Sequence, residues 1–254
     1  MVLDDLSLKG KVAIVTGGGT GIGSGILMGL AEAGADIACV YSSHEPKEMK
    51  EYVESLGRKF IAIKANVENR NELDTIVDET LKAFGHYEIL VNNAGICPRS
   101  SALDYPEEMW DKIININENA VFFLSQKAAR YWVKNNIKGK IINLASMMSY
   151  LGGFNTSAYT ASKHAVQGIT RVLASELGQY GICVNALAPG WIKTNLSSAL
   201  VKDKDRYDSV RARIPMGDWG TPEVFKGVAA FLGSSASDYV TGVTIPVDGG
   251  YLTK

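Results

Sequence analysis

The sequence predicts an α/β fold, a single-domain doubly wound parallel sheet with helices on both faces, spanning residues 1–254. Two observations lead to this prediction. Short runs rich in β-branched residues alternate along the chain with longer segments of helical period. These runs are apolar throughout, as expected for parallel strands that are covered on both faces. Such a series of βαβ units winds into an open parallel sheet.

The predicted strands are short and recur along the whole chain. The first, KVAIVT at residues 11–16, leads into a glycine-rich turn within which a helix begins. The others are residues 35–40, 59–65, 88–92, 139–145, 181–188 and 243–247.

Two helix starts carry capping signals. Asn69 stands three residues before Glu72, as in a capping box, and Thr221 precedes Pro222 at a predicted cap and first helical position. Residues 189–220 show no clear period and contain several Pro, Gly and Trp residues. We therefore expect a substrate loop at about 189–220.

Composition excludes several classes of partner. The net charge is -1, from 26 basic and 27 acidic side chains spread along the chain, so neither nucleic acid nor a membrane surface is expected as a partner. No apolar run approaches the ~20 residues of a membrane span, and the acidic amino terminus does not resemble a signal peptide. We expect a cytoplasmic protein. Its cysteines, Cys39, Cys97 and Cys183, form no CxxC pair and are predicted to be reduced core residues, with no metal site.

The glycine-rich stretch TGGGTGIG, Thr16 to Gly23, lies between the first predicted strand and the following helix. Glycines permit a tight turn and let the backbone approach a pyrophosphate, whose charge the amino end of the helix favours. Neither G-x-G-x-x-G nor a G-x-x-x-x-G-K-[ST] loop can be read here, which argues against kinases and NTPases. The stretch predicts a dinucleotide site.

The segment YTASK places Tyr159 and Lys163 four residues apart. On a helix both side chains lie on the same face, one turn apart. Taken alone, this spacing fits a solvated helix face as well as a catalytic pair.

Several motifs occur together and in a fixed order along the chain. They are Thr16, Gly17, Gly21 and Gly23 in TGxxxGxG, NNAG at 92–95, Asn117 in NIN, Ser146 in LASMMS, Tyr159 and Lys163 in YTASK, and PGWIKT at 189–194. In these motifs the chain resembles the short-chain dehydrogenase/reductase family over essentially its whole length. The resemblance implies a Rossmann-like fold and an NAD(P)-dependent oxidoreductase that transfers a hydride between cofactor and a secondary alcohol or ketone.

The resemblance also implies the catalytic roles. Tyr159 is the expected acid/base, and Lys163 with the positive nicotinamide is expected to lower its pKa, because a free phenol near ~10 is a poor base at neutral pH. Ser146 is expected to hydrogen-bond the substrate oxygen. The backbone of Asn117 is expected to hold a water that links Lys163 to solvent.

The implied cofactor site gathers residues from the ends of several strands. They are Gly17, Thr20, Gly21, Ile22, Gly23, Tyr41, Ser42, Ser43, Asn66, Val67, Asn93, Ala94, Gly95, Tyr159, Lys163, Pro189, Gly190, Ile192 and Thr194. Two positions depart from common members of the family. Asn66 stands where many have an aspartate, and Tyr41, Ser42 and Ser43 supply no acid to exclude a 2'-phosphate. Since Thr20 stands where a base is common, we expect NADP(H) or NAD(H), with a slight preference for NADP(H).

The substrate is predicted from local resemblance. LGRKF at 56–60, RIPMGDWGTP at 213–222 and SSASDYVTG at 234–242 resemble the 2-deoxygluconate 3-dehydrogenases and 2-dehydro-3-deoxygluconate 5-dehydrogenases, which act on sugar acids. Arg99 offers a fork to a carboxylate. The other expected substrate residues are Ser146, Met147, Asn155 and Trp191.

Other functions stay open on the sequence alone. Met147 and Trp191 suit an apolar ketone as well as they suit a sugar acid, and a 3-oxoacyl thioester reductase is a further alternative. A non-catalytic nucleotide-binding regulator has no chemical reason to keep Tyr159, Lys163 and Ser146. Relatives of this length commonly form homotetramers, and the apolar tail of GVTIPVDGGYL at 242–252 is expected to be exposed in a monomer.

Overall fold

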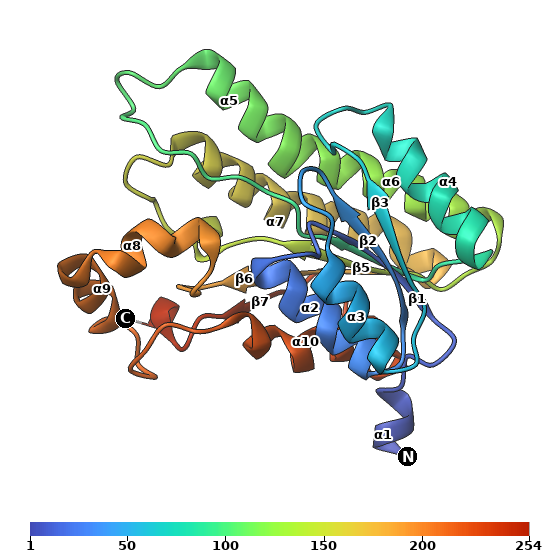
Figure 1. The fold of residues 1–254 in the computed structure, drawn as a ribbon. Helices are drawn as coiled ribbons and strands as arrows, with labels where there is room; N and C mark the ends of the chain where they lie inside the picture. The colour runs from blue at the N-terminus through green and yellow to red at the C-terminus, as the bar shows by residue number, and fades with distance from the viewer. Residues whose placement is uncertain (254) are drawn as a thin grey trace.

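The computed structural model describes residues 1–253, and it confirms the predicted fold class (Figure 1). One sheet of seven strands has the order β3-β2-β1-β4-β5-β6-β7, and every neighbouring pair is parallel. The strands are β1 (Val12–Thr16), β2 (Asp36–Tyr41), β3 (Phe60–Lys64), β4 (Ile89–Asn92), β5 (Lys140–Leu144), β6 (Cys183–Pro189) and β7 (Thr244–Val247).

Helices cover both faces of the sheet (Figure 1). Apolar side chains of α2, α3 and α10 pack on one face, and those of α4, α6 and α7 pack on the other. The helices are α1 (Val2–Asp5), α2 (Gly21–Glu32), α3 (Lys47–Ser55), α4 (Glu72–Phe84), α5 (Glu107–Ile114), α6 (Ala120–Lys134), α7 (Ser157–Leu177), α8 (Ser198–Lys202), α9 (Lys204–Arg211) and α10 (Lys226–Gly233). None of these helices, among residues 1–253, is both long enough and apolar enough to cross a bilayer.

The alternation of side chains along β1 shows why the predicted strands are apolar throughout. Ala13 and Val15 belong to the core beneath α2 and α10, whereas Val12 and Ile14 belong to the core beneath α4 and α6. A strand in the middle of this sheet has no solvent face, and successive side chains point to opposite faces.

One predicted helix start is wrong and another is confirmed. Helix α4 begins at Glu72 with Asn71 at the capping position, so Asn69 is not its N-cap. Asn69 instead forms an Asx turn before the helix: its Oδ1 accepts from the backbone N–H of Asn71 at 3.1 Å, and its Nδ2 donates to the Glu72 carboxylate at 3.1 Å. Thr221 does stand at the capping position of a 3₁₀ helix, Pro222–Phe225, with proline at its first position, although its side chain makes no capping hydrogen bond.

The region 189–220 contains more regular structure than its sequence indicates. It includes the short helices α8 and α9, drawn in orange in Figure 1, after a 3₁₀ turn at Asn195–Ser197. Apolar and aromatic side chains from this region pack with Met147 and Tyr251 in a small core of their own. Tyr251 is only 5% exposed, so the expectation of an exposed apolar tail is wrong at that residue.

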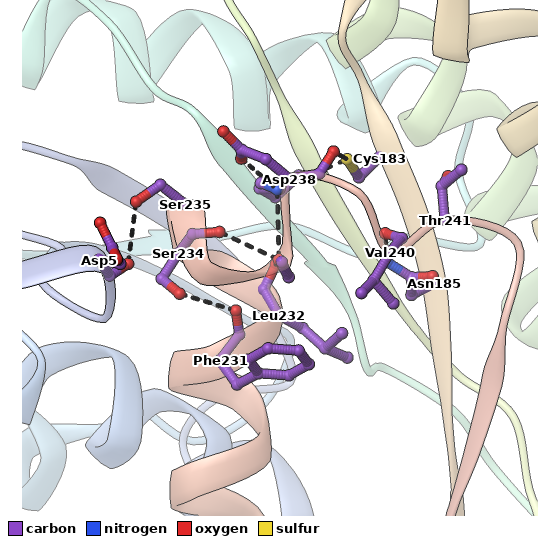
Figure 2. Close-up of polar contacts among 12 residues, drawn as sticks. Asp5, Cys183, Asn185, Phe231, Leu232, Ser234, Ser235, Asp238, Val240 and Thr241 are labelled. Carbon is purple, nitrogen blue, oxygen red and sulfur yellow. Dashed lines mark hydrogen bonds and ion pairs between the residues drawn. The ribbon is translucent and has the colours of Figure 1, made fainter. Parts of the chain in front are cut away.

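At the amino edge of the sheet, polar contacts join segments that are distant in the sequence (Figure 2). Ser235 Oγ donates to the carbonyl of Asp5 at 3.0 Å, and Asn185 Nδ2 donates to the carbonyl of Val240 at 2.8 Å. Cys183 Sγ lies 3.5 Å from the carbonyl of Asp238. These contacts fix the segment after α10 against the start of β6.

All three cysteines are free thiols, as predicted, but they are not all core residues. Cys39 and Cys183 are buried, whereas Cys97 is only half-buried. Cys97 lies after β4, near Tyr159 and Lys163. Its thiol raises the pKa of both side chains. The prediction of a core cysteine is therefore wrong for Cys97.

Candidate active site

The crevice for a dinucleotide lies between β1 and β4, where the strand order reverses direction. In open α/β sheets, ligands bind outside the carboxyl ends of the strands at such a point. Asn93, directly after β4, donates from Nδ2 to the carbonyls of Thr16 at 2.8 Å and Gly17 at 3.0 Å. The loops after β1 and β4 are thereby locked together at the crevice.

The glycine loop has the shape that a pyrophosphate requires. Gly17 and Gly21 have φ values of 63° and 56°, in the left-handed region that favours glycine. A Cβ atom on Gly23 would lie 2.2 Å from the carbonyl oxygen of Gly17, so only glycine fits there. Helix α2 begins at Gly21, and its first N–H groups lack intrahelical partners. These residues fit a dinucleotide.

Residues of the PGWIKT motif lie on the other side of this loop. Thr194 Cγ2 is 3.5 Å from the position that a Cβ of Gly21 would take. Gly190 passes closely over Asp248, where a Cβ would lie 2.6 Å from the Cα atom. Pro189 ends β6 and Ile192 is buried, so the motif runs from the sheet edge to the amino end of α2.

The predicted ribose contacts lie at the end of β2. Tyr41 is half-buried, and Ser42 and Ser43 are exposed. Ser43 Oγ is 3.0 Å from Nδ1 of His44, a residue absent from the predicted site. The loop passes beside the glycine loop, because a Cβ on Gly19 would lie 2.9 Å from Pro46 Cβ.

The predicted adenine contact follows β3. Asn66 is exposed, and its Oδ1 accepts from the backbone N–H of Glu68 at 3.1 Å. Its own N–H donates to the carboxylate of Glu72 at 2.7 Å, which fixes the turn. Val67 beside it is buried.

Ser146, Tyr159 and Lys163 come from two elements that meet behind the crevice. Ser146 caps a 3₁₀ turn just after β5, and Tyr159 and Lys163 lie on the first turns of α7. The hydroxyl of Ser146 lies near enough to the hydroxyl of Tyr159 to lower the pKa of the phenol. Ser149 Oγ accepts from the N–H of Ser146 at 3.3 Å and donates to the carbonyl of Lys163 at 2.6 Å. The two elements are therefore held in register.

The lysine lies beneath the tyrosine ring. Lys163 Nζ is 5.6 Å from the ring centroid of Tyr159 and donates to the carbonyl of Leu144 at 2.5 Å. Burial lowers the pKa of Lys163 to about 8. Burial also raises the pKa of Tyr159 to about 12, and the nearby hydroxyl of Ser146 offsets part of this effect. The expected lowering of the Tyr159 pKa by Lys163 is not found in this structure, because desolvation prevails.

Asn117 sits in a π-helical turn, Asn115–Asn119, between α5 and α6. The side chain of Asn117 is fully buried, accepts from the N–H of Ile96 at 2.9 Å and donates to the carbonyl of Ile96 at 2.9 Å. It also donates to Ser162 Oγ at 3.3 Å, next to Lys163. The side chain thus links the loop after β4 to α7, a link that the sequence pattern does not reveal.

The predicted substrate residues surround this centre on different segments. Arg99 is exposed, and its charge acts on Tyr159. Asn155 is exposed with φ 58°, and its carbonyl accepts from the N–H of Ser100 at 3.1 Å, which joins the two loops. Met147 is buried and packs in the same cluster as Trp191.

Sequence reasoning missed part of the surroundings. Cys97 and Tyr105 lie near the centre, and burial, together with the nearby thiol of Cys97, raises the pKa of Tyr105. Trp219 and Tyr251 pack against Trp191 with centroid distances of 5.0 and 6.3 Å. Only the clustering of tryptophan, proline and glycine in 189–220 hinted at this aromatic wall.

A family model and several known proteins match nearly the whole length of this chain. The family model described as enoyl-(acyl carrier protein) reductase matches residues 17–252. A 2-dehydro-3-deoxy-D-gluconate 5-dehydrogenase of Dickeya dadantii is 48% identical over 254 residues, 100% of each chain. A 5-keto-D-gluconate 5-reductase of Escherichia coli is 39% identical over 250 residues, 98% of each chain.

A solved structure is similar in shape as well. The crystal structure of a gluconate 5-dehydrogenase from Burkholderia cenocepacia in complex with NADP and tartrate has a TM-score of 0.93 and 35% identity, and the match covers 100% of each chain. The sequence motifs, the fold and these full-length matches all indicate the same protein family. The chain belongs to the short-chain dehydrogenase/reductase family, and it is an NAD(P)-dependent oxidoreductase.

Proposed function

We propose that this enzyme interconverts a ketone and a secondary alcohol in a sugar acid, with NADP(H) or NAD(H) as cofactor. The observation that carries the chemistry is the hydroxyl pair of Ser146 and Tyr159 above the ammonium of Lys163. The substrate class rests on the relatives named above, which are named for reactions of gluconate derivatives. The glycine loop and the amino end of α2 hold the pyrophosphate in this proposal.

A nicotinamide cofactor bound in the crevice supplies the hydride in reduction and accepts it in oxidation. In the reductive direction Tyr159 carries the proton for the substrate oxygen, and its raised pKa keeps the phenol protonated at neutral pH. The hydroxyl of Ser146 donates a hydrogen bond to the same oxygen as negative charge develops there. Both hydroxyls lie on the same side of the centre, so one substrate oxygen can accept from both.

Proton return to Tyr159 is assigned to Lys163. Its Nζ lies under the ring, and its pKa of about 8 lets the amine gain and lose a proton near neutral pH. In this proposal the π-helical turn leaves the backbone carbonyl of Asn117 free to hold a water beside Lys163. Tyr159→Phe should then abolish turnover and leave cofactor affinity largely intact, whereas Lys163→Ala should impair both.

We infer a modest preference for NADP(H). Hydroxyls of Ser42 and Ser43 stand at the end of β2, and no carboxylate among residues 41–44 repels a 2'-phosphate. No arginine there forms a bidentate pair with it either. Catalytic efficiency measured with both cofactors tests this preference. An efficiency more than about a hundredfold higher with NAD(H) contradicts it.

The substrate assignment is tested with a panel of keto sugar acids, neutral keto sugars, bulky ketones and a 3-oxoacyl thioester. Because Arg99 is exposed beside the catalytic centre, we propose that its guanidinium binds the substrate carboxylate. Arg99→Ala should raise KM for the acids about tenfold and leave the neutral sugars unchanged. Arg99→Lys, which keeps the charge without the planar fork, should fall between the two.

Two results would refute the sugar-acid assignment. Acids and neutral sugars would react equally well, or Arg99→Ala would leave KM for the acids unchanged. Faster turnover of the 3-oxoacyl thioester would instead favour the alternative of a 3-oxoacyl thioester reductase.

Assembly and location are part of the proposal. We propose a homotetramer, because half-exposed apolar side chains on and after α6 and α7, among them Val133, Val172 and Tyr180, line the outer side of these helices. The three free thiols support a reducing cytoplasmic location. We also infer that the sheet and region 189–220 work as one domain. Sedimentation showing only monomer at micromolar concentration would contradict the tetramer.

A further inference from the structure

An aromatic wall lies beside the catalytic serine. Tyr207 stacks on Trp219 with ring centroids 5.3 Å apart and an interplanar angle of 12°, and Trp219 packs on Trp191 at 5.0 Å. Met147, the residue after Ser146, belongs to the same apolar cluster. The wall therefore joins helix α9, which carries Tyr207, to the residue adjoining the proposed catalytic hydroxyl.

The carboxylate of Asp218 connects the segments that form this wall. Asp218 Oδ1 accepts from the hydroxyl of Tyr207 at 2.5 Å and from the backbone N–H of Trp219 at 2.8 Å. Asp218 Oδ2 accepts from Lys193 Nζ at 3.0 Å. Both carboxylate oxygens therefore accept hydrogen bonds, one from α9 and one from the loop after β6 that carries Trp191 and Lys193.

Backbone contacts make the connection rigid on the side of Trp191. The N–H of Gly220 donates to the carbonyl of Trp191 at 2.9 Å, and the N–H of Lys193 donates to the carbonyl of Gly220 at 2.9 Å. Helix α9 has other contacts besides the Tyr207–Asp218 bond. Arg211 Nε donates to the carbonyl of Gly217 at 2.8 Å, Trp219 Nε1 donates to the carbonyl of Tyr207 at 3.4 Å, and Val210 is buried in the same apolar cluster.

The wall also contains a polar group with no acceptor among the residues that the structure describes. Trp191 Nε1 is buried and makes no hydrogen bond within residues 1–253. A buried indole N–H usually finds a partner.

We propose that Asp218 is a positioning residue for the substrate: it holds Tyr207 and α9 on the wall formed by Trp219 and Trp191, and so maintains the substrate-binding surface. Substrate affinity then depends on the fraction of molecules in which α9 is in place, because only that state presents the complete wall. This inference rests on the proposed function, since it concerns the substrate side of the same site. The chemistry of Ser146, Tyr159 and Lys163 does not depend on Asp218.

The test compares Asp218→Asn, Tyr207→Phe and the double variant with wild type. Asp208→Asn is the matched control, because Asp208 is exposed on α9 and its carboxylate makes no hydrogen bond or ion pair among residues 1–253. KM and kcat are measured with whichever carbonyl compound of the panel the wild type turns over best. Trypsin cleavage after Lys202, Lys204 and Arg206 is measured without substrate by mass spectrometry.

Asp218→Asn should raise KM about fivefold, as expected for a partly exposed network, and leave kcat within about twofold. Trypsin should cleave α8 and α9 faster in this variant. Tyr207→Phe should act in the same direction, and the double variant should be no worse than Asp218→Asn, because both changes break one connection. Cofactor affinity and the Asp208→Asn enzyme should match wild type.

Two results would overturn the proposal. In the first, trypsin cleaves Asp218→Asn faster while its KM stays at the wild-type value. Loosening of α9 would then have no effect on substrate affinity. In the second, neither quantity changes. If the wild type reduces no keto sugar acid but does reduce another member of the panel, the sugar-acid proposal fails. The same KM and cleavage comparison then still decides the role of Asp218.

Discussion

The lysine assigned to catalysis should make the folded protein less stable, and replacing it should show this directly. Lys163 is 4% exposed, and no carboxylate among residues 1–253 pairs with it. Its ammonium donates to the carbonyl of Leu144 at 2.5 Å. Burial lowers its pKa from 10.5 to about 8, so the fold disfavours the charged form. Lys163→Met keeps an unbranched side chain and removes the charge.

The magnitude follows from the two pKa values. The difference between 10.5 and about 8 corresponds to roughly 3 kcal/mol of unfavourable free energy for the buried ammonium. The lost hydrogen bond to Leu144 offsets about 1 kcal/mol of the gain. Lys163→Met should therefore stabilise the protein by about 2 kcal/mol at pH 7. For a chain of this size that raises Tm by roughly 4–8 °C, and turnover should be abolished.

The pH dependence has a defined sign. Below pH 8 both the folded and the unfolded state hold the Lys163 proton, and the full cost is present. Between about 8 and 10.5 the folded state releases the proton first, so wild-type stability rises with pH. The advantage of Lys163→Met should thus be largest at pH 7 and nearly absent at pH 10.5. Tm measured by calorimetry at both pH values tests this.

A second buried lysine provides the control. Lys140 is also buried, but its Nζ lies 2.8 Å from Asp238 and 3.2 Å from Ser237 Oγ. Lys140→Met should lower stability, because it breaks a formed ion pair. A Lys163→Met protein that melts below wild type at pH 7, or whose Tm difference does not change with pH, would refute the reasoning.

Three further predictions concern packing, the π-helical turn and the cofactor. Gly25→Ala should lower the free energy of unfolding in urea by about 3 kcal/mol or more, because its Cβ would lie 1.8 Å from the carbonyl oxygen of Pro222. Gly227→Ala is the control and should not destabilise the protein, because the space around its Cβ position is open. Asn117→Ala should cost about 2–4 kcal/mol in the same assay and reduce turnover, because it leaves buried backbone groups unpaired; unchanged stability would count against this. Ser43→Asp should shift the efficiency ratio toward NAD(H) by about tenfold or more, and an unchanged ratio would remove Ser43 from the ribose site.

The strands were predictable from the sequence to within about two residues at each end. The predicted strand at 35–40 is β2, Asp36–Tyr41, and the predicted strand at 88–92 is β4, Ile89–Asn92. The reason is physical. A parallel strand between two helical layers must be apolar along its whole length, and that requirement is local in the sequence.

The parts that the sequence did not predict depend on contacts between distant segments. The helices α8 and α9 gain their stability from Trp219 and Tyr251 rather than from their own period. The bond between Tyr207 and Asp218 spans eleven residues, and the clamp of Asn117 on Ile96 spans twenty-one. No window of a few residues contains such information. The motifs identified candidate residues, but they did not show which groups hold them in place.

Two features that are unfavourable for folding lie side by side at the centre assigned to catalysis. Asn117 lies in a π-helical turn, a rare arrangement in which one more residue is accommodated than in an α-helix, and Lys163 is a buried ammonium without a carboxylate partner among the described residues. Either feature is expected to lower stability by itself. They are joined through Ser162, whose hydroxyl accepts from Asn117 at 3.3 Å and donates to the carbonyl of Tyr159 at 2.8 Å. Departures from local folding preference are expected where function requires them. Their coincidence next to Tyr159 therefore supports the catalytic assignment independently of the sequence motifs.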